Sequence, residues 1–566
     1  MNSKMMKQTI KFMSAGVLAL SLIFFVLNAG EASQQSQSDS SGGNIFLPLV
    51  QQSVAEPAPQ PIIQPGSEIS GNVFYVSRNG NNSNGRTWAT AWNELDQIDW
   101  GQVKPGDGVV IDGGSSSMTY RTTLRPAASG TDSNPIIVQL SADNGRNGQA
   151  IIFGGNSQPL PECGQSSWDS SQHDQAGIAG IQLDNGISNV LIDGRKRAGF
   201  MIHGWAEHGV KFNPDKINNN QDDNPRNITL RYIEVYNNGG VEQKNDGSSS
   251  NLWYPLHSGA GIKLAGVGHV FSFLEVHDNS ADAIQSAYTN PGGGVYNNMD
   301  DFTLTDSWLY NQRPHSGTDN SPSGETCTAN NRGGCDELGA PNMGKDYHDY
   351  PSTLANRQES FNWCTHSDGI QIYSSNQLDT MHIERTIIGP NFMNALLLGD
   401  RNGSNHTAWV DNLTMRDVVL TRYMFVAMGM KNPSNQAGKN WDIENVTMYG
   451  HFSNMQKGTV NLDSNANYDE HRIANSILMY GRTNMPNGNV AFSNNCEYAM
   501  YSDTIGGLKT DPQFKTVLNR DVFESNLNVD FATVFTDDYT PQNSSCQSAG
   551  SGIHSVSNLL ARFNRD

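Results

Sequence analysis

The sequence predicts an all-β fold, a solenoid of parallel strands, from three observations. Short stretches with a common pattern recur along the chain, at Gly180–Leu183, His257–Leu264, Asp282–Ser286 and His366–Ile372. Within them apolar residues alternate with long polar ones, which is typical of a strand with one buried face. The composition, with 56 Gly and 36% hydrophobic residues, is too rich in turn formers for a helical bundle and too apolar for disorder. Because a solenoid grows by adding coils, one elongated domain accommodates most of the 566 residues.

Residues 1–32 are typical of a secretory signal peptide. Lys4, Lys7 and Lys11 precede an apolar run from Phe12 to Leu27, and Ala29–Ala32 supplies small residues for cleavage. An uncleaved membrane anchor is the alternative, because the run is rather long. No later stretch is apolar enough to span a bilayer, so we expect a secreted or cell-surface protein with no membrane contact after cleavage.

Residues 33–71 are rich in Ser, Gln and Pro, a composition that cannot bury a core and that predicts a flexible or semi-extended spacer. From Val73 the composition changes. Phe74–Trp88 indicates a strand and a Gly/Asn loop, Ala91–Leu95 a short amphipathic helix, and Pro105–Ile111 a second strand.

This order of elements resembles the opening of secreted right-handed parallel β-helix proteins, among them polysaccharide lyases of the chondroitinase B and pectate lyase kinds. The resemblance implies a single-stranded right-handed parallel β-helix with loop insertions, in which an N-terminal helix caps the apolar end. Many activities share this fold, so the resemblance alone does not identify the reaction.

We expect the β-helix to span residues 72–495. A second series of strand-like stretches, most of them about 28 to 41 residues apart, supports this span and fits one coil plus a variable loop; its members are Asn227–Leu230, Asp301–Leu304, Thr380–Ile383, Asn412–Met415, Trp441–Ile443 and Arg472–Ala474. The large gap from Leu304 to Ile383 predicts an insertion at about residues 313–363 that projects from one face and has a functional role. Residues 496–566 are interpreted as closing coils and a cap, with a terminal helix within Ser555–Phe563.

The six cysteines of an exported protein can all form disulfides. Cys327 with Cys335 would close a local loop, and Cys496 with Cys546 would hold the C-terminal region, which leaves Cys163 and Cys364. The net charge of −20 opposes binding to nucleic acid or to an anionic membrane surface. A polyanionic substrate therefore needs a local basic patch or a metal bridge. We expect a monomer.

Adjacent coils of a parallel β-helix lie about 4.8 Å apart, so equivalent positions form columns of neighbouring side chains. The repeats predict one column of Lys263, Gln285 and Gln371 and, beside it, a pair of aspartates, Asp282 and Asp368. Polar columns are ordinary on the outside of such folds, and aspartates are common before strands. Two carboxylates stacked this closely nevertheless raise the pKa of one of them or attract a cation. The pair is therefore a candidate for catalysis and for binding calcium.

Further candidate residues flank this cluster. His366 and His257 precede two of the repeats, and the aromatic residues Trp253, Tyr254 and Trp363 lie just upstream, where they would stack on sugar rings. Arg401 and Lys431 follow later strands near the same edge, where they would bind a carboxylate or act as a base. For each of these residues, packing or solvated surface charge is the competing interpretation. Glu207 and His208 receive no role.

The stretch Ser367-Asp-Gly-Ile-Gln371 is similar to the Asn-Thr-Asp-Gly strand of polygalacturonase-type glycosidases, and Asp368 matches their catalytic aspartate. The next coil has Asn394 where that family has paired aspartates, and neither its Gly-His-Gly nor its Arg-x-Lys motif follows. We therefore do not expect membership of that family.

These observations predict a secreted enzyme that degrades polysaccharide in a lateral groove. The favoured chemistry is β-elimination on a uronic-acid polymer, with Lys263, Lys431 or Arg401 as the base, and with calcium held by Asp282 and Asp368. One alternative is inverting hydrolysis by paired aspartates, which requires carboxyl groups about 6.5–9.5 Å apart. Another is a non-catalytic carbohydrate-binding or cell-surface β-helix.

Overall fold

The computed structural model divides into two compact units, Met1–Ala58 and Pro59–Asp566, and the residues that it describes all lie in the second. They are residues 69–155, 160, 179–213, 224–245, 251–255, 259–287, 298–312, 367–372, 377–392, 394–398, 409–423, 426–430, 439–450, 460–462, 471–479, 483–484, 490–498, 507–517 and 535–564. The signal peptide, most of the spacer, the long insertion and Cys163, Cys327, Cys335 and Cys364 lie outside these ranges.

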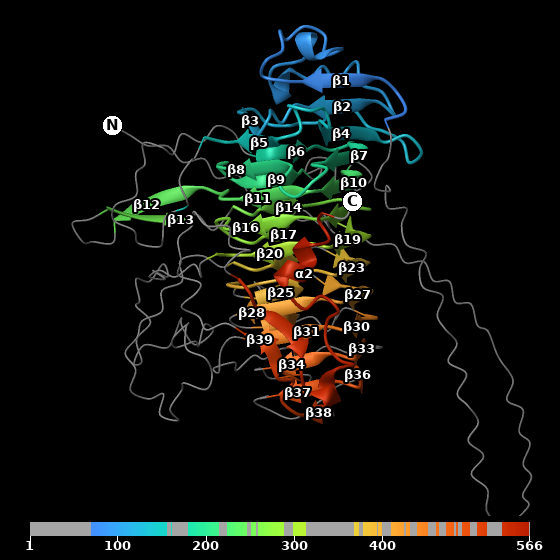
Figure 1. Cartoon of the computed structure of the whole chain (residues 1–566), viewed down its shortest axis with the longest axis vertical. Coiled ribbons are helices and arrows are strands. Elements are labelled where there is room, and N and C mark those ends of the chain that lie inside the picture. Colours follow the sequence, from blue (N-terminus) through green and yellow to red (C-terminus); the bar gives the residue numbers. More distant parts are fainter. Residues whose placement is uncertain are drawn as a thin grey trace, which may run out of the picture. The chain divides into compact units, whose positions relative to one another are not determined.

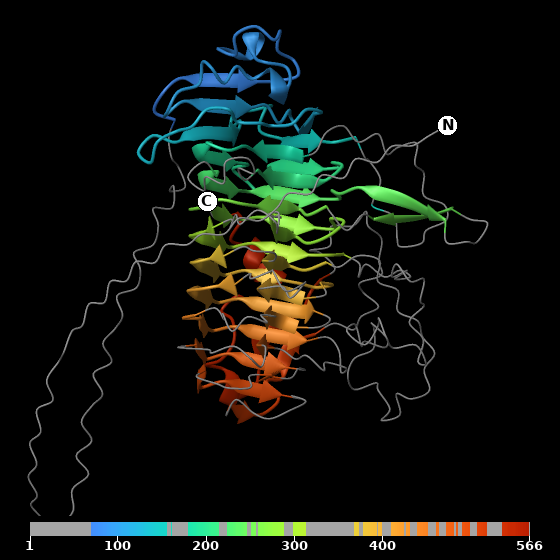
Figure 2. The ribbon, with the colours of Figure 1, turned by 180° about the vertical axis from the view of Figure 1, so that it is seen from behind.

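The described residues form the predicted parallel β-helix, in which the chain visits three long sheets in turn (Figures 1 and 2). Every pairing within these three sheets is parallel, and successive members of each sheet come from successive coils. The first sheet contains β1 (Val73–Val76), β2 (Gly108–Ile111), β4 (Ile136–Leu140), β7 (Ser188–Asp193), β10 (Arg226–Arg231), β15 (Val270–Ser272), β19 (Phe302–Thr305), β23 (Met381–Glu384), β27 (Leu413–Arg416), β30 (Asp442–Glu444), β33 (His471–Ala474) and β36 (Val490–Ser493).

The second sheet follows the first within most coils. Its strands are β3 (Ser117–Tyr120), β5 (Gln149–Phe153), β8 (Phe200–His203), β11 (Ile233–Tyr236), β16 (Glu275–His277), β20 (Trp308–Tyr310), β24 (Ile387–Ile388), β28 (Val419–Tyr423), β31 (Thr447–Gly450), β34 (Ile477–Met479), β37 (Cys496–Tyr498) and β38 (Leu508–Lys509).

The third sheet holds the strands whose pattern first indicated the fold. They are β6 (Ala179–Leu183), β9 (His208–Phe212), β14 (Ile262–Leu264), β17 (Ile284–Ser286), β21 (Ile370–Ile372), β25 (Asn394–Leu398), β29 (Val426–Met430), β32 (Val460–Leu462) and β35 (Thr483–Asn484). The smaller sheets are an antiparallel hairpin of β12 (Val241–Asn245) and β13 (Asn251–Pro255), a parallel set of β18 (Asn298–Met299), β22 (Gln377–Leu378) and β26 (Trp409–Val410), and the antiparallel pair β39 (Phe514–Thr516) and β40 (Asp538–Pro541).

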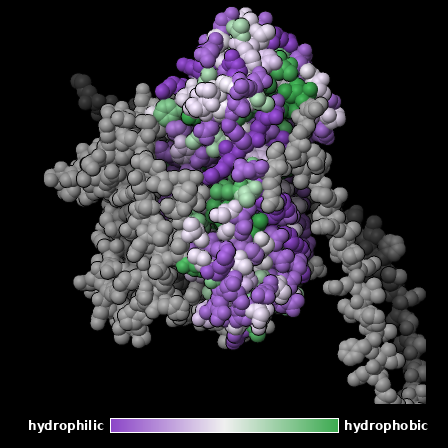
Figure 3. Space-filling view, viewed as in Figure 1, coloured by the Kyte–Doolittle hydropathy of each residue, from purple (hydrophilic) through white to green (hydrophobic). Residues whose placement is uncertain are grey.

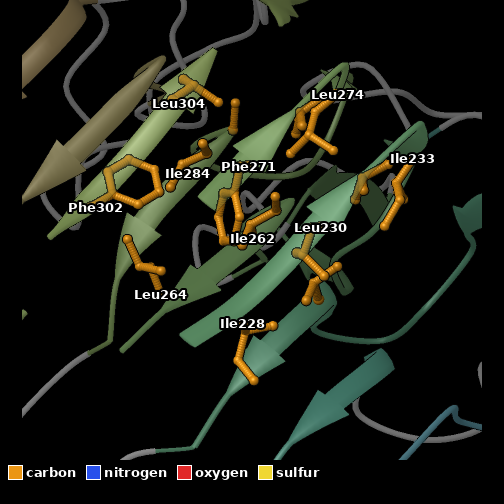
Figure 4. Close-up of a cluster of buried hydrophobic side chains, with 14 of the residues drawn as sticks. Ile228, Leu230, Ile233, Ile262, Leu264, Phe271, Leu274, Ile284, Phe302 and Leu304 are labelled. Carbon is orange, nitrogen blue, oxygen red and sulfur yellow. The ribbon is translucent and has the colours of Figure 1, made fainter. Parts of the chain in front are cut away.

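The core runs between the three sheets. It consists of the inward-facing side chains of strands in which apolar and polar residues alternate. In β14, Ile262 and Leu264 are fully buried, whereas Lys263 between them is only partly buried. Figure 4 shows side chains of the first sheet (Phe271 and Phe302) beside those of the third (Ile262 and Ile284) in one apolar cluster. The described residues seen in Figure 3 are mostly hydrophilic at the surface, with apolar patches among them, as expected when the outward residues are polar.

The sequence predicts one short helix after β1, and the structure instead has two three-residue 3₁₀ helices, η1 (Trp88–Thr90) and η2 (Leu95–Gln97). Thr87 and Thr90 form a reciprocal capping box around η1. Trp92 stacks on Phe74 with ring centroids 5.4 Å apart, and Leu95 is fully buried in the core. The apolar residues of this segment therefore pack as an amphipathic helix would, although the backbone forms only single turns.

The C-terminal residues pack against the outer face of the second sheet. η8 (Ser544–Cys546) includes a cysteine that forms the predicted disulfide with Cys496, and α2 (Val556–Leu560) lies in the predicted terminal helix, with Ser555 as its N-cap. Leu559 and Phe563 join an apolar cluster with residues that include Trp308 and Tyr232. Arg422 and Asp537 form a fully buried ion pair beneath this cover. Among the described residues no helix has both the length and the apolar character needed to cross a membrane.

Candidate functional site

The outward residues of the third sheet form a polar column across five coils. Its members are paired in register in the order Gln182, Lys211, Lys263, Gln285 and Gln371. The predicted alignment of Lys263, Gln285 and Gln371 is therefore confirmed. Leu397 of β25 occupies the next position, which ends the run of polar side chains.

Gln285 is the centre of a hydrogen-bond network within this column. Its amide oxygen accepts a hydrogen bond from Nζ of Lys263, and its Nε2 donates to Oδ2 of Asp282 at 2.6 Å and to Oε1 of Gln371 at 3.0 Å. Only this orientation of the amide satisfies both an ammonium donor and a carboxylate acceptor. Gln285 and Gln371 are buried at 6% and 8% exposure, so the network fixes the direction of the Lys263 side chain.

Asp282 and Asp368 lie on adjacent coils, as predicted, and each accepts a hydrogen bond from the backbone of the next coil. Oδ1 of Asp282 accepts the backbone N–H of Asp368 at 2.7 Å, and Oδ1 of Asp368 accepts the backbone N–H of Asn394 at 3.1 Å and its side-chain amide at 2.8 Å. Both aspartates are fully buried. These carboxylates therefore connect each coil to the next, which is a structural role that the sequence pattern did not distinguish from a catalytic one.

The turn that leads to Asp282 is held by a column of buried asparagines. Asn238 donates through Nδ2 to Oδ1 of Asn279 at 3.0 Å, and Oδ1 of Asn311 accepts the backbone N–H of Asp278 at 2.9 Å. Nδ2 of Asn311 donates to Oγ of Ser367 at 3.0 Å. Stacked side-chain amides of this kind satisfy buried backbone groups at turns, so successive turns enter the third sheet in one register.

The structure adds three residues that the sequence prediction missed: Lys211, Glu207 and His208. Nζ of Lys211 lies 3.1 Å from Oε2 of Glu207, whose side chain is 46% exposed. Lys211 has the same flanking pattern as Lys263, because Val210-Lys-Phe212 repeats Ile262-Lys-Leu264. That pattern was the signal that could have placed Lys211 in the column. The turn before β9 is anchored by Trp205, which is buried and donates through Nε1 to the carbonyl of Ile152 at 3.0 Å.

His208 is a buried neutral imidazole beside the two lysines. Burial and the charges of Lys263 and Lys211 lower its pKa to about 3. Its Nδ1 accepts the backbone N–H of Ala260 at 3.2 Å, so the proton of the neutral ring is on Nε2. That atom lies 3.8 Å from Oε2 of Glu207. Burial is the larger cause of this low pKa, and the charges of Lys263 and Lys211 add to it, on a chain whose net charge is −20.

The described residues show no calcium site, so the site predicted at Asp282 and Asp368 stays a prediction. Calcium takes six to eight oxygen ligands. One oxygen of Asp282 accepts a backbone N–H and the other accepts the amide of Gln285, and Oδ1 of Asp368 is likewise bonded. Within the described part of the chain, no group of three or more His, Cys, Asp and Glu side chains is arranged to hold a metal ion. We therefore assign no step to calcium.

The remaining predicted residues are not placed. His366, Arg401, Lys431, His257 and Trp363 lie outside the described residues. Trp253 and Tyr254 belong to β13, where they pair with Gln243 and Glu242 of β12, but their side chains are not among those described.

The chain matches no protein-family model and no curated protein. Among solved structures, it is similar to a pectate lyase, at 14% identity over 82% of this chain and 92% of that one, with a TM-score of 0.36. It is also similar to a rhamnogalacturonan lyase, at 12% identity over 87% and 98% of the two chains, with a TM-score of 0.35. A third is the lacto-N-biosidase from Eubacterium ramulus, at 13% identity over 78% and 67%, with a TM-score of 0.31.

Proposed function

We propose that this protein is a secreted polysaccharide lyase that cleaves a uronic-acid polymer by β-elimination on the outer face of the third sheet. The observation that carries the proposal is the pairing of Lys211 with Lys263 on adjacent coils, beside a neutral His208. Two neighbouring cations on an acidic protein supply the local basic patch that an anionic polymer requires. The side chain of Lys211 is 22% exposed and Lys263 is only partly buried, so both are at the surface.

The two lysines would divide the chemistry between them. Lys211 would bind the carboxylate of the uronate and stabilise the negative charge that develops as the C5 proton leaves. Lys263, held by Gln285, would accept that proton in the fraction of molecules in which its amine is neutral, in equilibrium with the cationic form that attracts the polymer. The C5–H electrons form the C4–C5 double bond, the C4–O bond breaks, and the departing oxygen takes a proton from solvent. No described residue is assigned to that last proton transfer.

Inverting hydrolysis by Asp282 and Asp368 receives less support. A general acid and a general base must reach the sugar and a water molecule. Both carboxylates are fully buried and bond to the backbone of the neighbouring coil. Their geometry therefore favours a structural role.

The test is to incubate the protein with pectate, alginate and chondroitin sulfate and to follow the absorbance of the unsaturated product. Elimination is expected with at least one polymer, at a rate that rises towards alkaline pH, because only a neutral amine accepts a proton. The proposal fails if no uronate polymer gives this product, with or without added calcium. Reducing-sugar release without the absorbance would indicate a hydrolase, and retention of a polymer without cleavage would indicate a binding protein.

A further inference from the structure

The carboxylate of Glu207 already occupies the position at which an anionic group would meet Lys211. Its Oε2 lies 3.1 Å from Nζ of Lys211 and 3.8 Å from Nε2 of His208. Because Nδ1 of His208 accepts a backbone N–H, the proton of the neutral ring is on Nε2, and that atom lies near the Glu207 carboxylate but beyond hydrogen-bond distance. We call Lys211, Lys263 and Nε2–H of His208 the anion cradle.

The cradle is fixed on one side and open on the other. His208 is 6% exposed and its ring is held by Ala260, and Lys263 is held by Gln285. Glu207, in contrast, is 46% exposed and lies in the turn before β9. A side chain exposed to this degree can leave its partner at small cost, because solvated ion pairs are weak.

We propose that Glu207 is a built-in competitor, whose carboxylate fills the anion cradle of the free protein and is displaced when the carboxylate of a uronate residue binds. This inference rests on the proposed function for the identity of the anion. Glu207 would act as a specificity residue: a neutral sugar cannot replace the charge interaction that Glu207 loses, whereas a uronate can. Glu207 would thus lower the affinity for every ligand that displaces it, and only an anionic ligand regains the lost charge interaction.

The experiment is to measure binding of oligogalacturonate, oligoalginate and chondroitin sulfate oligosaccharides to the full chain by calorimetry, with a neutral maltooligosaccharide for comparison. Glu207→Gln should tighten binding of at least one anionic oligosaccharide about two- to fivefold, the range expected for removal of a half-exposed ion pair. The matched control is Glu384→Gln. It makes the same change in net charge on β23 of the first sheet, where the side chain is 29% exposed and contacts Arg385, and it should leave the affinity unchanged.

A double-mutant cycle with Lys211→Met separates local competition from a general charge effect. In the Lys211→Met background, Glu207→Gln should no longer tighten binding. Equal tightening in both backgrounds, equal tightening by Glu384→Gln, or no binding of any anionic oligosaccharide to folded Glu207→Gln would each overturn the inference. Circular dichroism shows whether the variants are folded.

The result also separates this inference from the proposed reaction. If no polymer is cleaved but Glu207→Gln tightens anion binding through Lys211, the competitor is established and the lyase assignment fails. If a polymer is cleaved and Glu207→Gln leaves both affinity and KM unchanged, the competitor is excluded and the lyase assignment stands.

Discussion

Lys211 on β9 and Lys263 on β14 are directly paired across two adjacent coils of the third sheet. Like charges at paired positions of a sheet repel one another, so the arrangement costs free energy in the unliganded protein. Glu207 offsets part of that repulsion through Lys211, and Gln285 gives Lys263 a neutral acceptor. A pair of cations maintained in this way is expected where an anion binds.

Replacing Lys263 should remove the base of the proposed reaction. Lys263→Ala is expected to lower kcat by about 10²–10⁴-fold, the usual contribution of a positioned general base, while the thermal unfolding midpoint changes little. The measurement is the rate of unsaturated-product formation on the polymer that the wild type cleaves. Lys104→Ala serves as the control, since Lys104 is exposed and its ammonium group donates to the nearby carbonyl of Gly101. Activity within twofold of wild type in Lys263→Ala would rule out this base.

The aspartate pair should prove structural. Asp368→Ala removes the acceptor for two hydrogen bonds from Asn394 in a fully buried site, and it should lower the free energy of unfolding by about 1–3 kcal/mol. Asp368→Asn keeps an oxygen acceptor at the same place, so it should lower the free energy of unfolding less than Asp368→Ala does. Urea denaturation measures both variants. If Asp368→Asn were as stable as wild type but inactive, the carboxylate itself would be needed for catalysis.

His277 predicts a pH dependence of stability. Burial alone would lower its pKa, but the hydrogen bonds and charges of Asp278 (2.7 Å from Nδ1) and Glu234 (3.1 Å from Nε2) raise it to about 10. Because the unfolded value is about 6.5, the stabilisation is fully present below pH ~6.5 and is lost as the pH rises towards 10. The change should be of the order of a few kcal/mol. His277→Phe should abolish this slope in urea titrations between pH 6.5 and 10.

His203 provides the matched control for that experiment. Its ring stacks on Tyr236, 4.7 Å away, and Tyr236 in turn stacks on His277, so both histidines belong to one column of the second sheet. Burial lowers the pKa of His203 to about 4, so the folded protein loses stability as the pH falls from ~6.5 towards 4, because the unfolded chain then binds a proton that buried His203 does not. His203→Phe should change stability only in that acidic window. A change of slope between pH 6.5 and 10 in His203→Phe would contradict the assignment.

The disulfide between Cys496 and Cys546 should stabilise the C-terminal cover, the described residues from 535 onwards that pack against the outer face of the second sheet. It joins residues 50 positions apart, and loops of this length predict about 2–4 kcal/mol of stabilisation. The double variant Cys496→Ala/Cys546→Ala should therefore unfold at a lower urea concentration. Arg422→Met, which breaks the buried ion pair with Asp537, tests the same cover through another contact and should also destabilise it. Unchanged midpoints in both variants would show that the cover does not contribute to stability.

The sequence determined the third sheet and its register. In stretches such as Ile262-Lys-Leu264 and Ile370-Gln-Ile372, period-two alternation leaves one face apolar, and a shift of one residue would bury the polar side chain. The columns of polar side chains follow, because every strand must keep its apolar face buried. Lys211 escaped the prediction although Gly209-Val-Lys-Phe212 repeats the pattern of Gly261-Ile-Lys-Leu264, because loops of variable length separate the coils and hide the repeat.

Only the tertiary structure decided what the polar residues contact. Whether Asp282 faces solvent or bonds the backbone of the next coil depends on the path of a turn held by Asn279 and Asn311, and no local pattern encodes that path. The packing of Phe563 against Phe273 likewise arises when segments far apart in the sequence meet in space. The sequence by itself therefore determined which residues face inward, through the cost of burying polar groups, whereas the fold decided which outward groups become partners.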